Sequence, residues 1–246
     1  MADYSYSESG IPGILDEPVE MAEDVHPEIL RVTRSYVAAI REEPEPEITA
    51  LLLQSLPEGC WLDRLEYRVK GPISMARAIE EEVSKPVEGI SDEGLSFDEI
   101  VLKQACSLGD AVRYSCVVHS IDVFVKKAET LVGNLNSSRD AEVLKVFKIK
   151  NFFFDGNRYK GLHLCVKHIP SGIIFEVQMH FSESLEATRR THEDYEIFRD
   201  TTRSDVETVA AQARIVAVYA SLSHPPGLSD LENIGGVPVT KKIDRK

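Results

Sequence analysis

The stretch NRYKGLHLCVKHIPSGIIFEVQMH, residues 157–180, indicates the fold class of this chain more clearly than any other segment. Apolar and polar residues alternate on both sides of the tripeptide Pro-Ser-Gly at 170–172, which predicts two β-strands joined by a tight turn. With Ser171 and Gly172 at the centre of the turn, the register places His163 opposite His180. One face of the second strand then carries an acid, an amide and an imidazole in a row: Glu176, Gln178 and His180.

This polar face has two interpretations. Polar residues on one side of an antiparallel sheet most often form a solvated outer face, and the alternation alone favours that arrangement. The alternative is the floor of a ligand site, to which other segments of the chain would contribute further groups.

The bulk composition is that of a globular protein. The 246 residues, 43% of them hydrophobic, predict one large domain with a substantial core. No apolar run is long enough to cross a bilayer, and the first ten residues are polar and acidic, unlike a secretory signal. The four cysteines are dispersed without a CxxC pair, which favours reduced thiols. We therefore expect a protein that acts in the cytoplasm without a membrane partner, whether or not it is first delivered into a target cell.

The formal net charge of −13 is unevenly distributed along the chain. Residues 1–59 hold 13 acids and 3 bases, whereas residues 60–170 hold 16 of each. The overall charge argues against DNA as a partner, but it leaves room for a local phosphate site in the middle of the chain. The acidic N-terminal segment is either a solvated tail or a segment that lies near a basic site and competes with an anionic ligand.

The expected fold class is α/β (α+β), a mixed and roughly five-stranded sheet flanked by helices. Besides the hairpin, strands are predicted at 65–70, 111–119 and 143–154. Helices are predicted at 72–83, 98–107, 123–135, 182–198 and 204–222. The expected organisation is an irregular acidic segment, N-terminal helices, one α/β domain and a weakly specified tail, at 1–25, 26–56, 57–224 and 225–246.

A candidate phosphate site lies around residue 70. Arg68 and Lys70 are two apart on a predicted strand and point the same way, and Ser74 and Arg77 lie in the first turns of the helix that follows. Backbone N–H groups at a helix N-terminus attract phosphate, so these residues together would hold a triphosphate. An ordinary surface Arg/Lys pair beside a helix is an equally good interpretation.

Further candidates flank the other predicted strands. Asp110 lies at the mouth of a strand with Arg113 three residues on, and is either a Mg²⁺ ligand or a turn residue. Lys148 and Lys150 put two cations on one strand face, or they form a polar sheet face. Tyr159 stands at a strand entrance, where it would stack on a base or serve as half-buried packing.

Together these candidates suit phosphoryl or pyrophosphoryl transfer. That chemistry depends on positioning, charge neutralisation and Mg²⁺ more than on a covalent nucleophile. Cations, an aromatic platform and two carboxylates that could share a metal ion, Asp110 and Glu176, supply those needs. Under this interpretation the polar face of the hairpin is the floor of a nucleotide site.

The order and spacing of these segments resemble the RelA/SpoT-type nucleotide pyrophosphokinase (alarmone synthetase) domain. The matching stretches are RVKGPISMAR (68–77), GDAVRYSCVV (109–118), KIKN (148–151), NRYKGLH (157–163) and FEVQMH (175–180). The stretch FEVQMHFSESLEATRRTHEDYEIFRD is further similar to the branch of small, single-domain and toxic synthetases. The resemblance covers about residues 60–200 and implies a nucleotidyltransferase-like synthetase domain at 57–224.

The resemblance also implies an activity and a role for each matching residue. The activity is ATP-dependent transfer of the β,γ-pyrophosphate to a ribose 3′-hydroxyl of a purine nucleotide. The residues implied for ATP binding are Arg68, Lys70, Ser74, Arg77 and Arg113. The resemblance implies that Asp110 and Glu176 bind Mg²⁺ and that Glu176 helps to deprotonate the hydroxyl. The residues implied for the acceptor are Lys148, Lys150, Tyr159, Lys160, His163, Gln178 and His180.

Two positions depart from the family pattern. Lys160 stands where Gln is frequent, and His180 stands where housekeeping members often have Arg. Neither a hydrolase domain nor regulatory domains are evident, so we expect a synthetase-only enzyme. Because unregulated use of ATP is harmful to a cell, an antitoxin or immunity protein is a plausible partner.

Three functions stay open at this point. The first is synthesis of a (p)ppGpp- or (p)ppApp-type alarmone, with the base undecided because stacking tolerates either purine. The second is a toxin that pyrophosphorylates the 3′ end of tRNA, which would need a basic surface from residues such as Lys126, Lys127, Arg189 and Arg190. The third is a catalytically inactive nucleotide-binding module.

Overall fold

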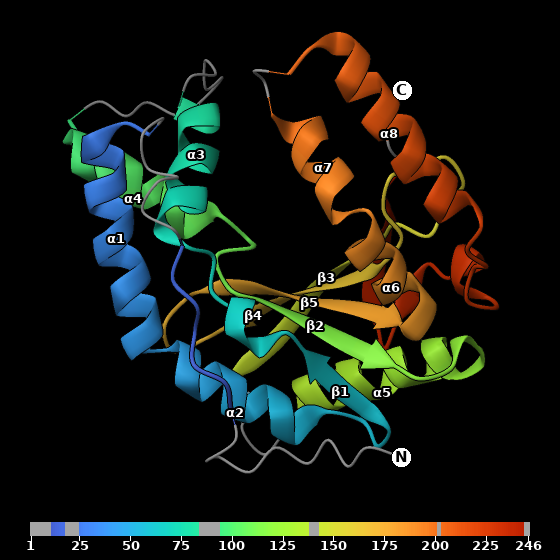
Figure 1. Ribbon diagram of the computed structural model, residues 1–246. Helices are drawn as coiled ribbons and strands as arrows, with labels where there is room; N and C mark the ends of the chain where they lie inside the picture. Colours follow the sequence, from blue (N-terminus) through green and yellow to red (C-terminus); the bar gives the residue numbers. More distant parts are fainter. Residues whose placement is uncertain (1–10, 18–24, 84–93, 138–142, 201–202, 244–246) are drawn as a thin grey trace. The chain divides into compact units, whose positions relative to one another are not determined.

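Helices and strands are mixed along the chain in a computed structural model that describes residues 11–17, 25–83, 94–137, 143–200 and 203–243 (Figure 1). The helices are α1 (Pro27–Glu42), α2 (Glu45–Ser55), α3 (Pro72–Val83), α4 (Phe97–Ser107), α5 (Phe124–Ser137), α6 (Ser182–Arg190), α7 (His192–Arg199) and α8 (Asp205–Ala220). The strands are β1 (Cys60–Asp63), β2 (Arg113–Val118), β3 (Leu144–Asn151), β4 (Leu162–His168), β5 (Ile174–Phe181), β6 (Asn233–Ile234) and β7 (Val237–Lys241). Each helix in the described residues is too short or too polar to cross a bilayer.

The seven strands form one mixed sheet in the order β1-β2-β5-β4-β3-β7-β6. β1 and β2 are antiparallel, whereas β3 and β7 are parallel. The α+β class predicted from the sequence is confirmed, but the expectation of roughly five strands is wrong. Of the three strands that were not predicted, β1 lies just before residues 65–70, and β6 and β7 lie in the tail that was expected to be weakly specified.

The chain divides into two compact units. Unit 1 comprises Met1–Gln54, Arg64–Tyr114 and Lys167–Glu176, and unit 2 comprises Ser55–Asp63, Ser115–Val166 and Val177–Lys246. Strands β2, β4 and β5 contribute residues to both units. The division does not follow sequence order, so the predicted domain boundaries stay predictions.

Unit 1 contains three helices that lie side by side, α1, α3 and α4 (Figure 1). One stripe of α1 is buried because its apolar residues recur every three or four positions, as in Ile29, Val37 and Ile40. From the same stripe, the Thr33 hydroxyl donates to the Pro72 carbonyl at 3.0 Å. This bond attaches α1 to the first residue of α3 and so helps to fix the N-terminus of α3.

Unit 2 has an aromatic core under α5. Phe124 of α5 meets Phe153 and Phe181 edge-to-face, with ring centroids 5.5 and 6.1 Å apart. β7 pairs in parallel with β3, with Ile149 opposite Val239. α7 and α8 lie side by side in Figure 1.

Two strand predictions need correction. Residues 65–70 do not form a strand: Leu65–Tyr67 is a 3₁₀ turn (η3), and Val69 makes only an isolated bridge to Val112. The strand in this region is β1, which ends where Arg64 adopts the left-handed conformation with φ of 53°.

The hairpin turn is also longer than predicted. The His168 N–H donates to the Ile173 carbonyl, and the Gly172 N–H donates to the His168 carbonyl, both at 2.8 Å. The loop therefore runs over residues 169–172, with Gly172 at a φ of 74°. The predicted register is off by two residues, which is one side-chain period of a strand, so the assignment of residues to faces is unchanged.

Candidate functional site

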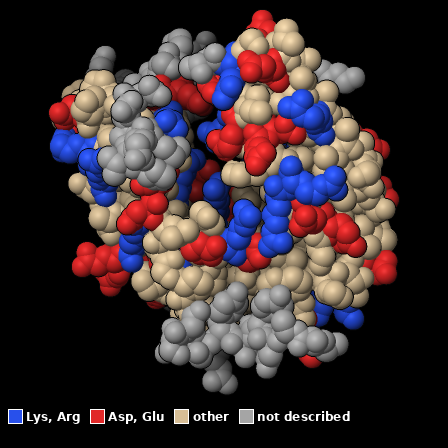
Figure 2. Space-filling model, viewed as in Figure 1, with Lys and Arg blue, Asp and Glu red and all other residues tan. Residues whose placement is uncertain are grey.

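The predicted site residues lie in both units, and those with the same implied role lie in the same unit. Unit 1 holds those implied for ATP and Mg²⁺, namely Arg68, Lys70, Ser74, Arg77, Asp110, Arg113 and Glu176. Unit 2 holds those implied for the acceptor, namely Lys148, Lys150, Tyr159, Lys160, His163, Gln178 and His180. Figure 2 shows Lys and Arg side chains grouped on one face with Asp and Glu interspersed, so a net charge of −13 coexists with local groups of cations.

The segment that leads into α3 brings a cation and a carboxylate together. The Lys70 ammonium lies 2.9 Å from Asp110 Oδ2, and the Lys70 N–H donates to the Ala111 carbonyl at 2.9 Å. Ser74 and Arg77 are half-buried on α3, one helical turn apart. The segment therefore has the fixed charges and the helix N-terminus that an anionic ligand requires.

Arg68 differs from the prediction, because its guanidinium is buried in a hydrogen-bonded network. Its Nε and Nη2 donate to the two carboxylate oxygens of Glu45 at 2.5 and 3.3 Å. Its Nη1 donates to the carbonyls of Leu65 and Pro12, both at 2.8 Å. Four N–H groups are thus used within unit 1, and the guanidinium acts in this arrangement as a core ion pair rather than as an exposed phosphate ligand.

Two further side chains complete this network. The Thr49 hydroxyl donates to Glu45 and is 2.8 Å from the Tyr114 hydroxyl. Burial raises the pKa of Tyr114 well above its usual range, so the phenol stays protonated. Glu45 is the first residue of α2 and belongs to the PEPE stretch at 44–47.

Asp110 and Glu176 are the carboxylates proposed for Mg²⁺. Asp110 is 34% exposed, whereas Glu176 is buried at 6%. The Glu176 N–H donates to the Val112 carbonyl at 3.1 Å, which brings the β5 residue to the strand that Asp110 precedes. In the described residues no group of three or more His, Cys, Asp or Glu side chains is gathered for a metal ion. Asp110 and Glu176 are nevertheless the type of ligand that Mg²⁺ uses, because that ion is commonly held by one or two carboxylates together with substrate phosphates.

The polar face of β5 is not solvated. Glu176 and His180 are 6% and 1% exposed, and β5 lies between β2 and β4 in the sheet. The interpretation as an ordinary solvated face is therefore wrong for Glu176 and His180, whereas Gln178 between them is half-buried.

In unit 2, one tyrosine, two histidines and a serine form a hydrogen-bonded chain. The Ser184 hydroxyl donates to the Phe181 carbonyl at 3.0 Å and lies 3.4 Å from Nδ1 of His180. The Tyr159 hydroxyl lies 3.1 Å from Nε2 of His180 and 2.9 Å from Nε2 of His163. The chain thus connects β4, β5 and the start of α6.

Gly161 makes room for the tyrosine in this chain. A side chain at residue 161 would collide with the Tyr159 ring. The ring also packs against Phe152 and Tyr219, with centroids 5.5 and 6.1 Å apart. The orientation of Tyr159 is therefore set by packing and by two hydrogen bonds.

No family model matches the chain, and no curated protein matches it. Solved structures do. Small alarmone synthetase 1 from Bacillus subtilis, bound to its product pppGpp, is similar over 81% of this chain and 87% of that chain, with 13% identity and a TM-score of 0.41. The type VI effector Tas1, in complex with its immunity protein, is similar over 78% and 93%, with 14% identity and a TM-score of 0.41. A GTP pyrophosphokinase family protein from Streptococcus pneumoniae is similar over 78% and 88%, with 15% identity and a TM-score of 0.41.

At 13–15% identity and TM-scores of 0.41, these matches leave the roles of individual residues to be argued from this chain's own side chains.

His180 is a buried imidazole with an unusual pKa. Burial, and to a smaller extent the neighbouring His163, lowers the pKa of His180 from 6.5 to about 3. The imidazole is therefore neutral in the folded protein across the physiological pH range.

The low pKa of His180 predicts a loss of stability in acid. Above pH 6.5 the imidazole is neutral in both states, whereas between pH 6.5 and about 3 only the unfolded state binds the proton. Across this window the free energy of unfolding should fall by up to about 1.4 kcal/mol per pH unit relative to a His180→Gln variant. Urea unfolding at a series of pH values measures the difference, and parallel profiles for the two proteins would contradict the assignment.

Lys160 differs from its prediction as an acceptor ligand. Its side chain is fully buried, and its ammonium contacts Asp155 Oδ1 at 3.3 Å, the Leu222 carbonyl at 3.1 Å and His224 Nε2 at 2.8 Å. These partners account for all three N–H donors of the ammonium. Lys160 thus joins the loop after β3 to the segment after α8, and its assignment to the acceptor stays a prediction.

The other predicted acceptor residues are partly exposed. Lys148 and Lys150 are half-buried on one face of β3, and Gln178 is half-buried on β5. Arg113, predicted for ATP, is exposed at the start of β2. The roles predicted for these four side chains stay predictions.

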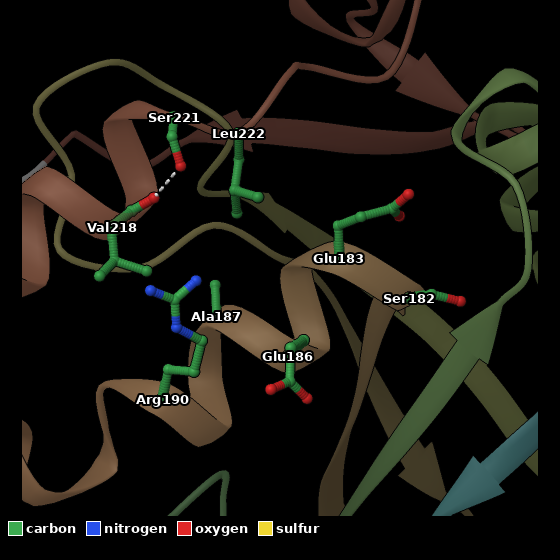
Figure 3. Close-up of a pocket in the computed structure, with 8 residues that line it drawn as sticks. All are labelled: Ser182, Glu183, Glu186, Ala187, Arg190, Val218, Ser221 and Leu222. Atoms are coloured by element: carbon green, nitrogen blue, oxygen red, sulfur yellow. Dashed lines mark hydrogen bonds between the residues drawn. The ribbon is translucent and has the colours of Figure 1, made fainter.

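A separate hollow in unit 2 holds none of the predicted site residues (Figure 3). It is lined by residues of α6 and of the end of α8, namely Ser182, Glu183, Glu186, Ala187, Arg190, Val218, Ser221 and Leu222. The Ser221 hydroxyl donates to the Val218 carbonyl at 2.7 Å, the bond drawn in Figure 3. Of the basic residues considered for tRNA, only Arg190 lines this hollow.

Proposed function

We propose that the chain transfers the β,γ-pyrophosphate of ATP to the 3′-hydroxyl of a purine nucleotide and so makes a (p)ppGpp- or (p)ppApp-type alarmone. The observation that carries the proposal is the group in unit 1 formed by Lys70, Asp110 and the start of α3. A cation that directly precedes a helix N-terminus and contacts a carboxylate suits a triphosphate and its metal ion.

Unit 1 would bind and activate ATP. Lys70, Ser74, Arg77 and Arg113 would hold its phosphates, with the backbone amides of α3. Mg²⁺, held by Asp110 and Glu176 with phosphate oxygens, would neutralise the charge that develops on the transferred group. The Glu176 carboxylate would also accept the proton of the attacking hydroxyl.

Unit 2 would bind the acceptor nucleotide. The ring of Tyr159 would stack on the purine, with its hydroxyl held by His163 and His180. Lys148 and Lys150 would meet acceptor phosphates as two cations on one strand face. Stacking tolerates both purines, so the assay below separates guanine from adenine.

Tyr159→Ala should raise KM for the acceptor about 5- to 100-fold, because stacking on one base contributes about 1–3 kcal/mol. Tyr159→Phe keeps the ring and removes only the hydroxyl, so its effect on KM should be smaller. Steady-state kinetics with varied acceptor and saturating ATP measure both. An unchanged KM in Tyr159→Ala would remove this residue from the acceptor site.

Transfer of label from γ-labelled ATP tests the proposed function. The protein is incubated with Mg²⁺ and with GDP, GTP, AMP, ADP or bulk tRNA in separate reactions, beside a Glu176→Gln control. Label in a guanine or adenine nucleotide supports the proposal and identifies the base. Label only in tRNA would replace it with pyrophosphorylation of tRNA, and no transfer to any acceptor would favour an inactive binding module.

The tRNA alternative has less support from the side chains. Lys127 donates to the Glu58 carbonyl at 2.5 Å, and Arg189 pairs with Asp63 at 2.9 Å. Two of the basic residues considered for tRNA therefore already have partners within unit 2. An inhibitory partner protein belongs to the proposal as well, since unregulated use of ATP would arrest growth of the producing cell.

A further inference from the structure

We propose that residues 11–17 form an internal inhibitor of ATP binding, with the carboxylate of Glu17 occupying the position of a phosphate group. The inference rests on the proposed function for the identity of the displaced ligand. All of the contacts that carry it lie within unit 1.

Glu17 binds the start of α3 as an anion would. Its Oε2 accepts the Ile73 N–H at 2.7 Å, and its Oε1 accepts the Ser74 N–H at 3.1 Å. Since Pro72 begins the helix and has no N–H, these are the first two amides that α3 offers. A carboxylate there is stabilised by the helix dipole and by charge-assisted hydrogen bonds, the same interactions that a phosphate would use.

The approach of Glu17 depends on Gly71. A Cβ at residue 71 would overlap the carboxyl group of Glu17. Gly71 directly follows Lys70, the cation proposed for ATP phosphates, so Glu17 lies against the backbone of the phosphate-binding segment. Glu17 and ATP would therefore compete for the same donors.

The rest of segment 11–17 is anchored independently of Glu17. The Leu15 N–H donates to the Glu66 carbonyl at 2.9 Å, and Asp16 pairs with Arg41 at 2.5 Å. The Pro12 carbonyl accepts from Arg68 Nη1 at 2.8 Å. These contacts hold the Glu17 carboxylate at a high local concentration near the start of α3. One of them involves Arg68, which the family resemblance implies for ATP binding.

The competition has a measurable size. An internal segment that is docked for 90–99% of the time raises the apparent Kd of its competitor about 10- to 100-fold. Weakening the contact should lower that Kd by a corresponding factor, whereas a mere capping role for Glu17 would change stability and leave ATP affinity unaltered.

The experiment compares the full-length wild type with Glu17→Gln and with Glu42→Gln. The control removes the same charge from an exposed position at the end of α1 in the same unit. Binding of a non-hydrolysable ATP analogue with Mg²⁺ is measured by calorimetry without an acceptor. We expect Glu17→Gln to bind about tenfold more tightly or better, and Glu42→Gln to bind as the wild type does.

Hydrogen exchange supplies a second readout that needs no variant. The Leu15 amide, protected by its bond to Glu66, should exchange faster when the analogue binds to the wild type, because the segment is displaced. Unchanged exchange at Leu15 with the analogue bound would overturn the inference.

The two proposals fail in distinguishable ways. Equal affinity of the wild type and Glu17→Gln for the analogue would overturn the internal inhibitor and leave the proposed function standing. An absence of analogue binding in every protein would overturn the proposed function, and the inference with it.

Discussion

Glu176→Gln should lower the rate of pyrophosphate transfer by about two to four orders of magnitude while the protein stays folded. The substitution keeps the size of a side chain that is 6% exposed, but it removes both the base and one of the two proposed metal ligands. Single-turnover transfer with labelled ATP measures the chemical step directly. Asp110→Asn should show a comparable loss, with ATP affinity reduced as well because Asp110 holds Lys70.

A matched control separates this role from a general effect of charge. Glu183→Gln makes the same change at an exposed position on α6 and should transfer at the wild-type rate. Near-wild-type turnover in Glu176→Gln would show that neither the base nor the metal ligand has been assigned correctly.

Glu45→Gln should lower the free energy of unfolding by about 3–5 kcal/mol, because it leaves the buried guanidinium of Arg68 without a counter-charge. The two side chains are 1% and 9% exposed, so solvent cannot replace the lost partner. The double variant Glu45→Leu with Arg68→Met should recover most of the loss, since it removes both charges together. Urea unfolding followed by circular dichroism measures all three proteins.

Glu47→Gln provides the comparison for this stability prediction. Glu47 lies on the same helix with its side chain 56% exposed, and the substitution should change stability by less than about 0.5 kcal/mol. A loss below about 1 kcal/mol in Glu45→Gln would indicate that the pair is weakly coupled or that water enters the network.

The hairpin shows what the sequence could predict. The period of two assigned Glu176, Gln178 and His180 to one face, and this survived a register error of two residues because faces repeat at that interval. The burial of that face could not be predicted, because it depends on side chains from other segments that pack onto it, such as Tyr159 and Ser184 against His180. Local alternation identifies a strand, whereas the order of strands decides which of them is central.

Arg68 and Lys160 have partners that the sequence could not predict. Both matched family positions for ligand binding, and both are buried with partners far along the chain: Glu45 lies 23 residues from Arg68, and His224 lies 64 residues from Lys160. The local sequence pattern around Arg68 or Lys160 does not indicate contacts with residues so far away in the chain. The tail did contain a signal that was missed, because Gly235-Gly236, both with positive φ, form the two-residue turn between β6 and β7.

The interleaving of the two units restricts how this protein can evolve. Each unit is assembled from three stretches of chain, and Glu176 and Val177 adjoin in β5 but belong to different units. No single crossover between related genes can therefore exchange one unit and keep the other intact. If unit 1 binds ATP and unit 2 binds the acceptor, as proposed, one recombination event cannot exchange one binding site without the other. A new acceptor specificity then has to arise through point substitutions.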